Sequence, residues 1–141
     1  YLELESAVIA QICDDLENAT QKDIPVVVDT TGSLIYLQET ILKRLRNLTR
    51  TVLLNLSIDK HEELFETYLQ DPKPVIWNGK YLPCEGENPQ KALSRCFGEL
   101  LVYRNKRYAL MSDLELDYTF HHSPETTVED LLEFVGISLK Q

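Results

Sequence analysis

The sequence has no run of about twenty apolar residues, no CxxC pair and no excess of basic residues. The first absence predicts that no segment spans a membrane, and no signal-peptide pattern is present. The formal charge of −9 argues against a dedicated nucleic-acid-binding protein, because phosphate backbones require a basic surface. The three cysteines (Cys13, Cys84 and Cys96) favour idle thiols over metal ligands, which predicts a reducing, cytoplasmic location.

The remaining composition is that of an ordinary globular domain. The chain has 141 residues, of which 43% are hydrophobic, and this suits one domain over residues 1–141. No internal repeat is visible, and we expect a monomer. The chain begins at Tyr1, inside a stretch with helical periodicity, so we expect further residues upstream of it.

The most informative stretch runs from Ile24 to Tyr36. Pro25 opens a run of three valines, Val26–Val28, which ends at the polar sequence DTTGS. An unbroken apolar run of this kind predicts a strand that is covered on both faces, as in a parallel sheet. Ligands bind at the carboxyl ends of such strands. Asp29 and the TTGS turn after it therefore predict one wall of a site, although a plain turn with Asp29 as a cap would have the same composition.

Apolar spacing and capping signals predict the order of the other elements. Helices are expected over 4–16, from about 41 to 48, from 59 to 69 with Leu64, Phe65 and Leu69 buried, from 88 to 107 and from 126 to 135. Strands are expected at 24–28, 51–58 and 114–120. This alternation predicts an α/β fold, namely a three-layer, doubly wound parallel sheet.

The segment 71–89 differs in composition from the rest of the chain. It holds four of the six prolines, two of the five glycines and the only tryptophan. A segment of this length without periodicity is typical of a lid or a binding loop. Asn88 and Pro89 at its end fit the N-cap and the first residue of the next helix.

Several short motifs, taken in order, resemble those of shikimate kinase, a small P-loop kinase of the nucleoside-monophosphate-kinase type. YLELE (1–5) resembles the family's FRxxE, and VVVDTTGSL (26–34) lies where the family has a strand leading into TGGG. KPVI (73–76) resembles the lid motif RPLL. RNKRY (104–108), with Asp113 after it, resembles RxPLY…AD, and TVEDLLEFV (127–135) resembles the closing helix.

The resemblance also shows departures from the family. The phosphate-binding loop GxxxxGK(S/T) does not occur in the chain, so that loop and the first strand would lie upstream of Tyr1. Leu2 stands at the position of the family's first substrate-binding arginine, and Lys73 replaces the arginine of the lid.

The resemblance implies ATP-dependent phosphoryl transfer to a hydroxyl of a small polar metabolite, with Mg²⁺ as the metal. Asp29 would bind Mg²⁺ or act as the base, and Lys73 and Lys80 would cover the phosphates. The acceptor would be held by Glu5, Thr30, Thr31, Gly32, Ser33 and Arg104. A non-catalytic binding or regulatory module derived from the same fold is the alternative, in which Arg104 and the lysines are plain surface residues.

Overall fold

The computed structural model describes residues 1–20 and 25–137, and this part of the chain forms two units. The first comprises Tyr1–Thr51, and the second comprises the chain from Val52 onward. The composition predicts one domain over residues 1–141, and the described residues divide into these two compact units. Ile24, the first residue of the predicted valine strand, lies outside the described residues.

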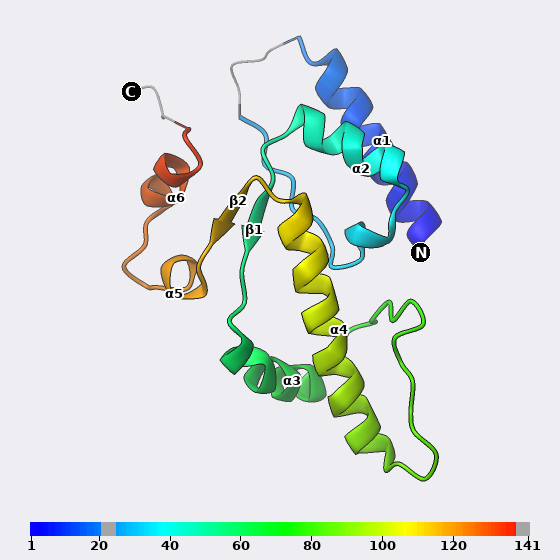
Figure 1. The fold of residues 1–141 in the computed structure, drawn as a ribbon. Coiled ribbons are helices and arrows are strands. Elements are labelled where there is room, and N and C mark those ends of the chain that lie inside the picture. The colour runs from blue at the N-terminus through cyan, green and yellow to red at the C-terminus, as the bar shows by residue number, and fades with distance from the viewer. Residues whose placement is uncertain (21–24, 138–141) are drawn as a thin grey trace. The chain divides into compact units, whose positions relative to one another are not determined.

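The described part of the first unit contains two α-helices and, between them in the sequence, one turn of 3₁₀-helix (Figure 1). Its elements are α1 (Leu2–Asn18), η1 (Leu34–Tyr36) and α2 (Glu39–Leu48). Its buried apolar side chains are Ile9, Cys13, Leu34, Ile35, Leu37, Leu42 and Leu45. Arg44 of α2 ties the two helices together, because its guanidinium donates to Asp14 at 2.6 Å and to Glu17 at 2.5 Å. The hydrogen bonding of Arg44 to Glu17 lowers the pKa of that carboxyl group.

The second unit contains a small parallel sheet and four α-helices within the described residues. Its elements are β1 (Val52–Leu54), η2 (Ile58–Lys60), α3 (His61–Gln70), α4 (Pro89–Met111), β2 (Leu114–Leu116), α5 (Tyr118–His121) and α6 (Val128–Phe134). Val52 pairs with Leu114, and Leu54 pairs with Leu116. The long helix α4 contributes four buried residues, Ala92, Cys96, Phe97 and Leu100. α3 packs beside α4, where Phe65 and Tyr68 place their rings 5.4 and 4.9 Å from that of Phe97.

The predicted doubly wound α/β sheet is wrong. The described chain is mostly helical, and its sheet consists of the two parallel strands β1 and β2 alone. Both strands are shorter than predicted. β2 ends at Leu116 because Asp117 starts α5, where its carboxylate accepts from the backbone N–H of Thr119 at 2.8 Å.

The valine run also differs from its prediction. Residues 25–30 have no regular secondary structure, and Val26 and Val27 are 64% and 86% exposed. A strand needs a neighbour that pairs its N–H and C=O groups, and an apolar composition alone does not supply one. The turn at Gly32 and Ser33 leads into η1 rather than from a strand into an α-helix.

The helix predictions were better than the strand predictions. α1, α2, α4 and α6 lie where apolar spacing placed them, and Asn88 caps α4 by accepting from the N–H groups of Gln90 and Lys91. The capping box of α6 is shifted by one residue, to Thr127 and Asp130. The predicted cap and burial of α3 were wrong, because no side chain caps that helix and no residue of it is buried.

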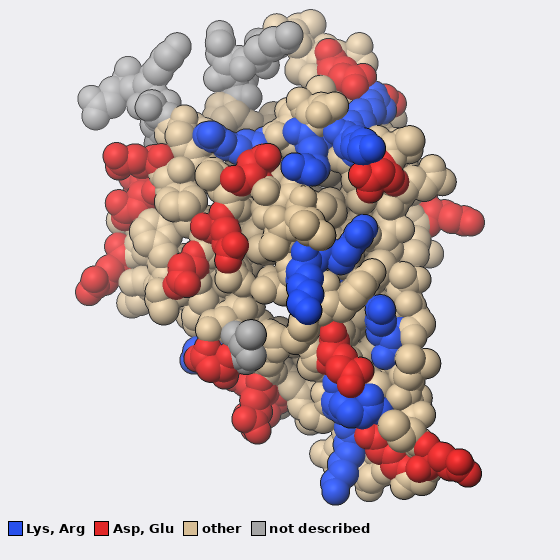
Figure 2. All heavy atoms as spheres, in the orientation of Figure 1, with Lys and Arg blue, Asp and Glu red and all other residues tan. Residues whose placement is uncertain are grey.

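No helix within residues 1–20 and 25–137 is both long enough and apolar enough to cross a bilayer. Figure 2 shows basic and acidic side chains interspersed on one face of the molecule.

Candidate functional site

Three of the residues predicted to hold an acceptor contact one another in the first unit. The carboxylate of Glu5 accepts hydrogen bonds from the hydroxyls of Thr31 and Ser33, the second at 2.7 Å. The two hydroxyls are 2.8 Å apart, and the backbone N–H of Ser33 donates to the Thr31 oxygen at 3.3 Å. We call Glu5, Thr31 and Ser33 the hydroxyl cluster.

Local structure explains why these three side chains meet. Glu5 lies in the first turn of α1, on the same face as the buried Ile9 and Cys13. Ser33 precedes η1, whose first two residues are buried, and is itself only 4% exposed. The turn that contains Thr31 and Ser33 is therefore held against α1, with its two hydroxyls directed at the Glu5 carboxylate.

The hydroxyl cluster has the chemistry of an alcohol-binding site. A carboxylate can accept several hydrogen bonds, and a hydroxyl can donate one while accepting others. A metabolite hydroxyl can therefore donate to Glu5 in place of Thr31, or donate to the Thr31 oxygen. Thr31 is exposed whereas Glu5 and Ser33 are buried, so Thr31 is the member that such a ligand reaches first.

The other predicted site residues of this unit are exposed to solvent. Asp29 and Thr30 are exposed and lie in the segment without regular structure, and Gly32 is exposed in the turn. Mg²⁺ is commonly held by one or two carboxylates together with substrate phosphates. Asp29 can supply one such ligand. No group of three or more His, Cys, Asp or Glu side chains in the described residues gathers into a metal site.

The segment 71–89, predicted to be a lid or a binding loop, lies along α4 in the second unit, and its last residue, Pro89, is the first residue of that helix. Arg104 donates to the Ile76 carbonyl at 3.0 Å. Farther along, the Lys80 ammonium lies 4.2 Å from the centroid of the Tyr103 ring. Asn78 and Gly79, both with positive φ, form the turn that directs Lys80 there, closed by a bond from the Lys80 N–H to the Trp77 carbonyl at 3.0 Å.

These contacts place the predicted cations of the second unit. Arg104 binds the backbone of the segment, and Lys80 is engaged with an aromatic ring. Lys73 pairs with Asp71 at 2.5 Å, and its side chain is 73% exposed. Of the three, Lys73 is therefore the one with the freedom to move onto a phosphate.

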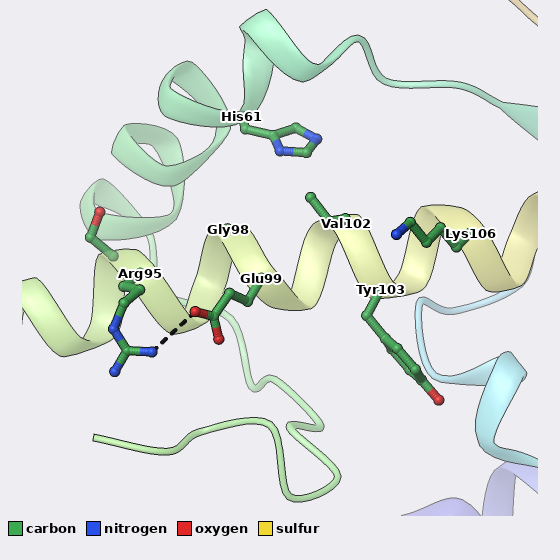
Figure 3. A pocket seen from close by; sticks show the side chains of 8 residues that line it. His61, Arg95, Gly98, Glu99, Val102, Tyr103 and Lys106 are labelled. Carbon is green, nitrogen blue, oxygen red and sulfur yellow. Dashed lines mark hydrogen bonds and ion pairs between the residues drawn. The ribbon is translucent and has the colours of Figure 1, made fainter. Parts of the chain in front are cut away.

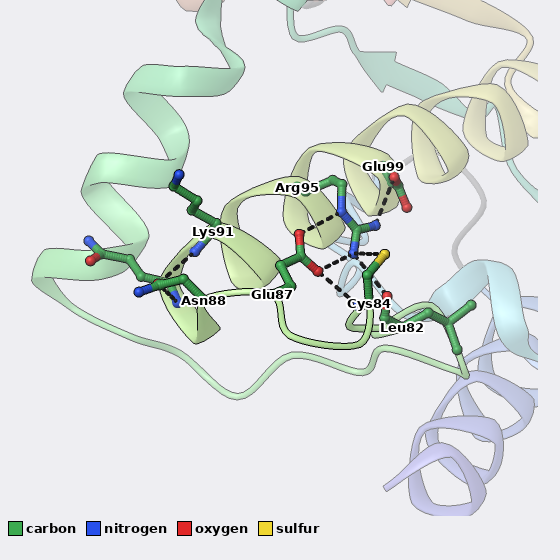
Figure 4. A network of polar contacts seen from close by, with 8 residues as sticks. Leu82, Cys84, Glu87, Asn88, Lys91, Arg95 and Glu99 are labelled. Atoms are coloured by element: carbon green, nitrogen blue, oxygen red, sulfur yellow. Dashed lines mark hydrogen bonds and ion pairs between the residues drawn. The ribbon is translucent and has the colours of Figure 1, made fainter.

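Arg95 holds the end of the same segment and was not among the predicted residues. Its guanidinium donates to Glu87 at 3.0 and 2.7 Å, to the Leu82 carbonyl at 2.9 Å and to Glu99 at 3.1 Å (Figure 4). Glu87 also accepts from the backbone N–H of Cys84 at 2.9 Å. The bonds from Arg95, with that from Cys84, lower the pKa of Glu87 to about 2.

A groove on α4 was missed as well. It has a volume of about 560 Å³ and is lined by His61, Ser94, Arg95, Gly98, Glu99, Val102, Tyr103 and Lys106. The groove depends on α3 lying against α4, so sequence spacing alone gives no sign of it. The one local signal was Gly98, a glycine within an otherwise regular helix.

Comparison with known proteins gave no match to this chain, whether among family models, curated proteins or solved structures. The resemblance to shikimate kinase therefore stays a prediction that rests on the motifs themselves. What the chain can do has to be argued from its own contacts.

Proposed function

We propose that this chain is the acceptor-binding part of an ATP-dependent phosphotransferase that acts on a hydroxyl of a small polar metabolite. The observation that carries the proposal is the hydroxyl cluster. Glu5 lies in α1, whereas Thr31 and Ser33 lie in the turn more than twenty residues later, and the motifs predict all three as acceptor ligands. Their bonds form a carboxylate–hydroxyl arrangement suited to orienting an alcohol.

The chemistry asks little covalent work of the protein. The acceptor oxygen forms a bond to the γ-phosphorus of ATP, the bond to the bridging oxygen of ADP breaks, and the hydroxyl proton passes to a base. Mg-ATP supplies the phosphoryl group and offsets its charge. The chain would position the acceptor through Glu5 and Thr31, while Asp29 would accept the proton or ligate the metal and Lys73 would approach the phosphates.

The test is isothermal titration of the chain with a panel of hydroxyl-bearing metabolites, with and without Mg-ATP. We expect at least one of them to bind. Glu5→Gln and Thr31→Val should each weaken that binding by about tenfold, because each removes a hydrogen-bonding partner of the ligand. Thr40→Ala, an exposed threonine of α2 in the same unit, is the matched control. Binding unaffected by both cluster variants would overturn the proposal.

A second candidate function is a binding module without catalysis. Two of the three cations that phosphoryl transfer would use already have contacts within the fold, which favours this module. Arg104 donates to the Ile76 carbonyl, and the Lys80 ammonium lies over the Tyr103 ring. A GxxxxGK(S/T) sequence encoded upstream of Tyr1 would favour the kinase, and its absence there would favour the module. We predict that the 141 residues by themselves bind an acceptor but do not turn over ATP. A coupled assay for ADP release tests this, and turnover above a protein-free blank would contradict it.

A further inference from the structure

The groove on α4 carries features that the proposed function does not use. Its volume of about 560 Å³ lies within the range of about 300–1,000 Å³ that is usual for small-molecule sites. Val102 and Gly98 of α4 form its floor, and His61 faces it from the start of α3 (Figure 3). Every residue that lines it belongs to the second unit, so it is separate from the hydroxyl cluster.

Gly98 has no explanation within the described fold. A glycine inside a helix lowers stability relative to alanine, so its presence calls for a reason such as a crowded site or a left-handed φ. Neither reason applies, because a Cβ at Gly98 would meet nothing within 4 Å and its φ is not positive. A ligand lying against the helix backbone at this point would account for the missing side chain.

The charged groups around the groove fall into two sets. Arg95 and Glu99 bind each other, and Arg95 also holds Glu87. The side chains of His61 and Lys106 make no hydrogen bond or ion pair with any residue in the described ranges. His61 does lie near Asp59, whose pKa is lowered mainly by a hydrogen bond from Ser57 and to a smaller extent by the nearby His61. In Figure 3 the Lys106 ammonium points along α4 towards Val102, on the side where His61 lies, whereas Tyr103 points away.

We propose that this groove binds a small organic anion with a planar apolar body. The ring of the ligand would lie on Gly98 and Val102, and its anionic group would accept hydrogen bonds from Lys106 and His61. The charges favour an anion because these two donors make no hydrogen bond or ion pair within the described ranges, whereas Arg44 and Arg95 are paired with carboxylates. Glu99 does not oppose it strongly, because its carboxylate is turned to Arg95.

The probe for this site is 8-anilinonaphthalene-1-sulfonate, an aromatic anion whose fluorescence rises in apolar surroundings. We expect saturable binding with one site per chain. Gly98→Leu should abolish that site, because the new side chain projects into open space and fills the groove. Leucine favours helix more than glycine does, so the variant should melt no lower than the wild type, which separates a blocked groove from a misfolded chain.

The cations are tested by a double variant, His61→Ala with Lys106→Ala. It should weaken binding of the sulfonate by tenfold or more and leave binding of the neutral analogue N-phenyl-1-naphthylamine unchanged. Lys91→Ala, an exposed lysine of α4 that does not line the groove, is the control and should change neither. The proposal fails if the sulfonate shows no saturable site, if Gly98→Leu leaves binding intact, or if the control matches the double variant.

Discussion

The carboxylate of Glu87 illustrates how one residue couples the fold to pH. It accepts two bonds from Arg95 and one from the Cys84 N–H, and its pKa falls to about 2 from an ordinary value of 4.5. Since the folded state holds the proton less tightly than the unfolded chain, the stabilisation is complete above pH 4.5. It is lost as the pH falls from there towards 2.

We therefore predict that Glu87→Gln lowers the melting temperature at pH 7 and flattens its fall between pH 4.5 and about 2. Circular dichroism melts over this pH range measure both effects. Glu85→Gln is the control: it alters a neighbouring exposed carboxylate that makes no hydrogen bond or ion pair within residues 1–20 and 25–137, and its melting profile should follow that of the wild type. Parallel pH profiles for Glu87→Gln and the wild type would show that the network does not stabilise the fold.

Arg104 also acts on the fold as a single side chain, since its bond to the Ile76 carbonyl holds the segment 71–88 beside α4. The only tryptophan, Trp77, follows Ile76 and lies 6.5 Å from the ring of Phe97, which makes it a reporter for this contact. We predict that Arg104→Ala increases quenching of Trp77 fluorescence by acrylamide. Lys91→Ala on the same helix should not. Equal quenching in all three proteins would mean that other contacts hold the segment.

At the scale of elements, the start of α4 is the helix end that the sequence predicted correctly. Asn88 caps α4, accepting from Gln90 and Lys91 at 2.9 and 3.4 Å, as its sequence position indicated. We predict that Asn88→Ala lowers the free energy of unfolding by about 1 kcal/mol, because two helix N–H groups lose their acceptor. Urea denaturation measures this. Asn88→Gly should lower the free energy of unfolding by only a few tenths of a kcal/mol. A larger loss for glycine than for alanine would argue against a capping role.

Helices were predictable because the periodicity that reveals them is local. Leu4, Val8, Ile12 and Leu16 recur every four residues and correctly predict the helix α1, with Ile9 and Cys13 beside them. The buried face was predicted less well, because Leu4 and Val8 are 68% and 50% exposed, whereas Ile9 and Cys13 are buried. The strand at Val26–Val28 was not predictable in the same way. A buried strand and an exposed extended segment have the same local composition, and only a partner elsewhere in the chain distinguishes them.

At the scale of the whole molecule, the sequence reached part of the candidate site and missed the rest. The motifs predict Glu5, Thr31 and Ser33 as acceptor ligands, and the three side chains are in contact. The Arg95 network joins Glu87 to Glu99, and the groove joins His61 to a helix that starts 28 residues later; neither follows from any periodicity. The two-stranded sheet likewise pairs segments about sixty residues apart, and the doubly wound fold was inferred from composition without that pairing.

The exposed valines carry a consequence for the behaviour of many molecules together. A short β-branched run with unpaired backbone is a template for cross-chain pairing, and flanking prolines and charges act as gatekeepers against it. Pro25 and Asp29 stand at the two ends of this run. We predict that Asp29→Val causes faster, concentration-dependent formation of thioflavin-positive aggregates, whereas Glu85→Val, with the same change of charge in another exposed loop, does not. If both variants stay dispersed, Asp29 is not needed to prevent aggregation of the valine run. If only Asp29→Val aggregates, the carboxylate at position 29 keeps the chains apart, independently of any role in binding a ligand.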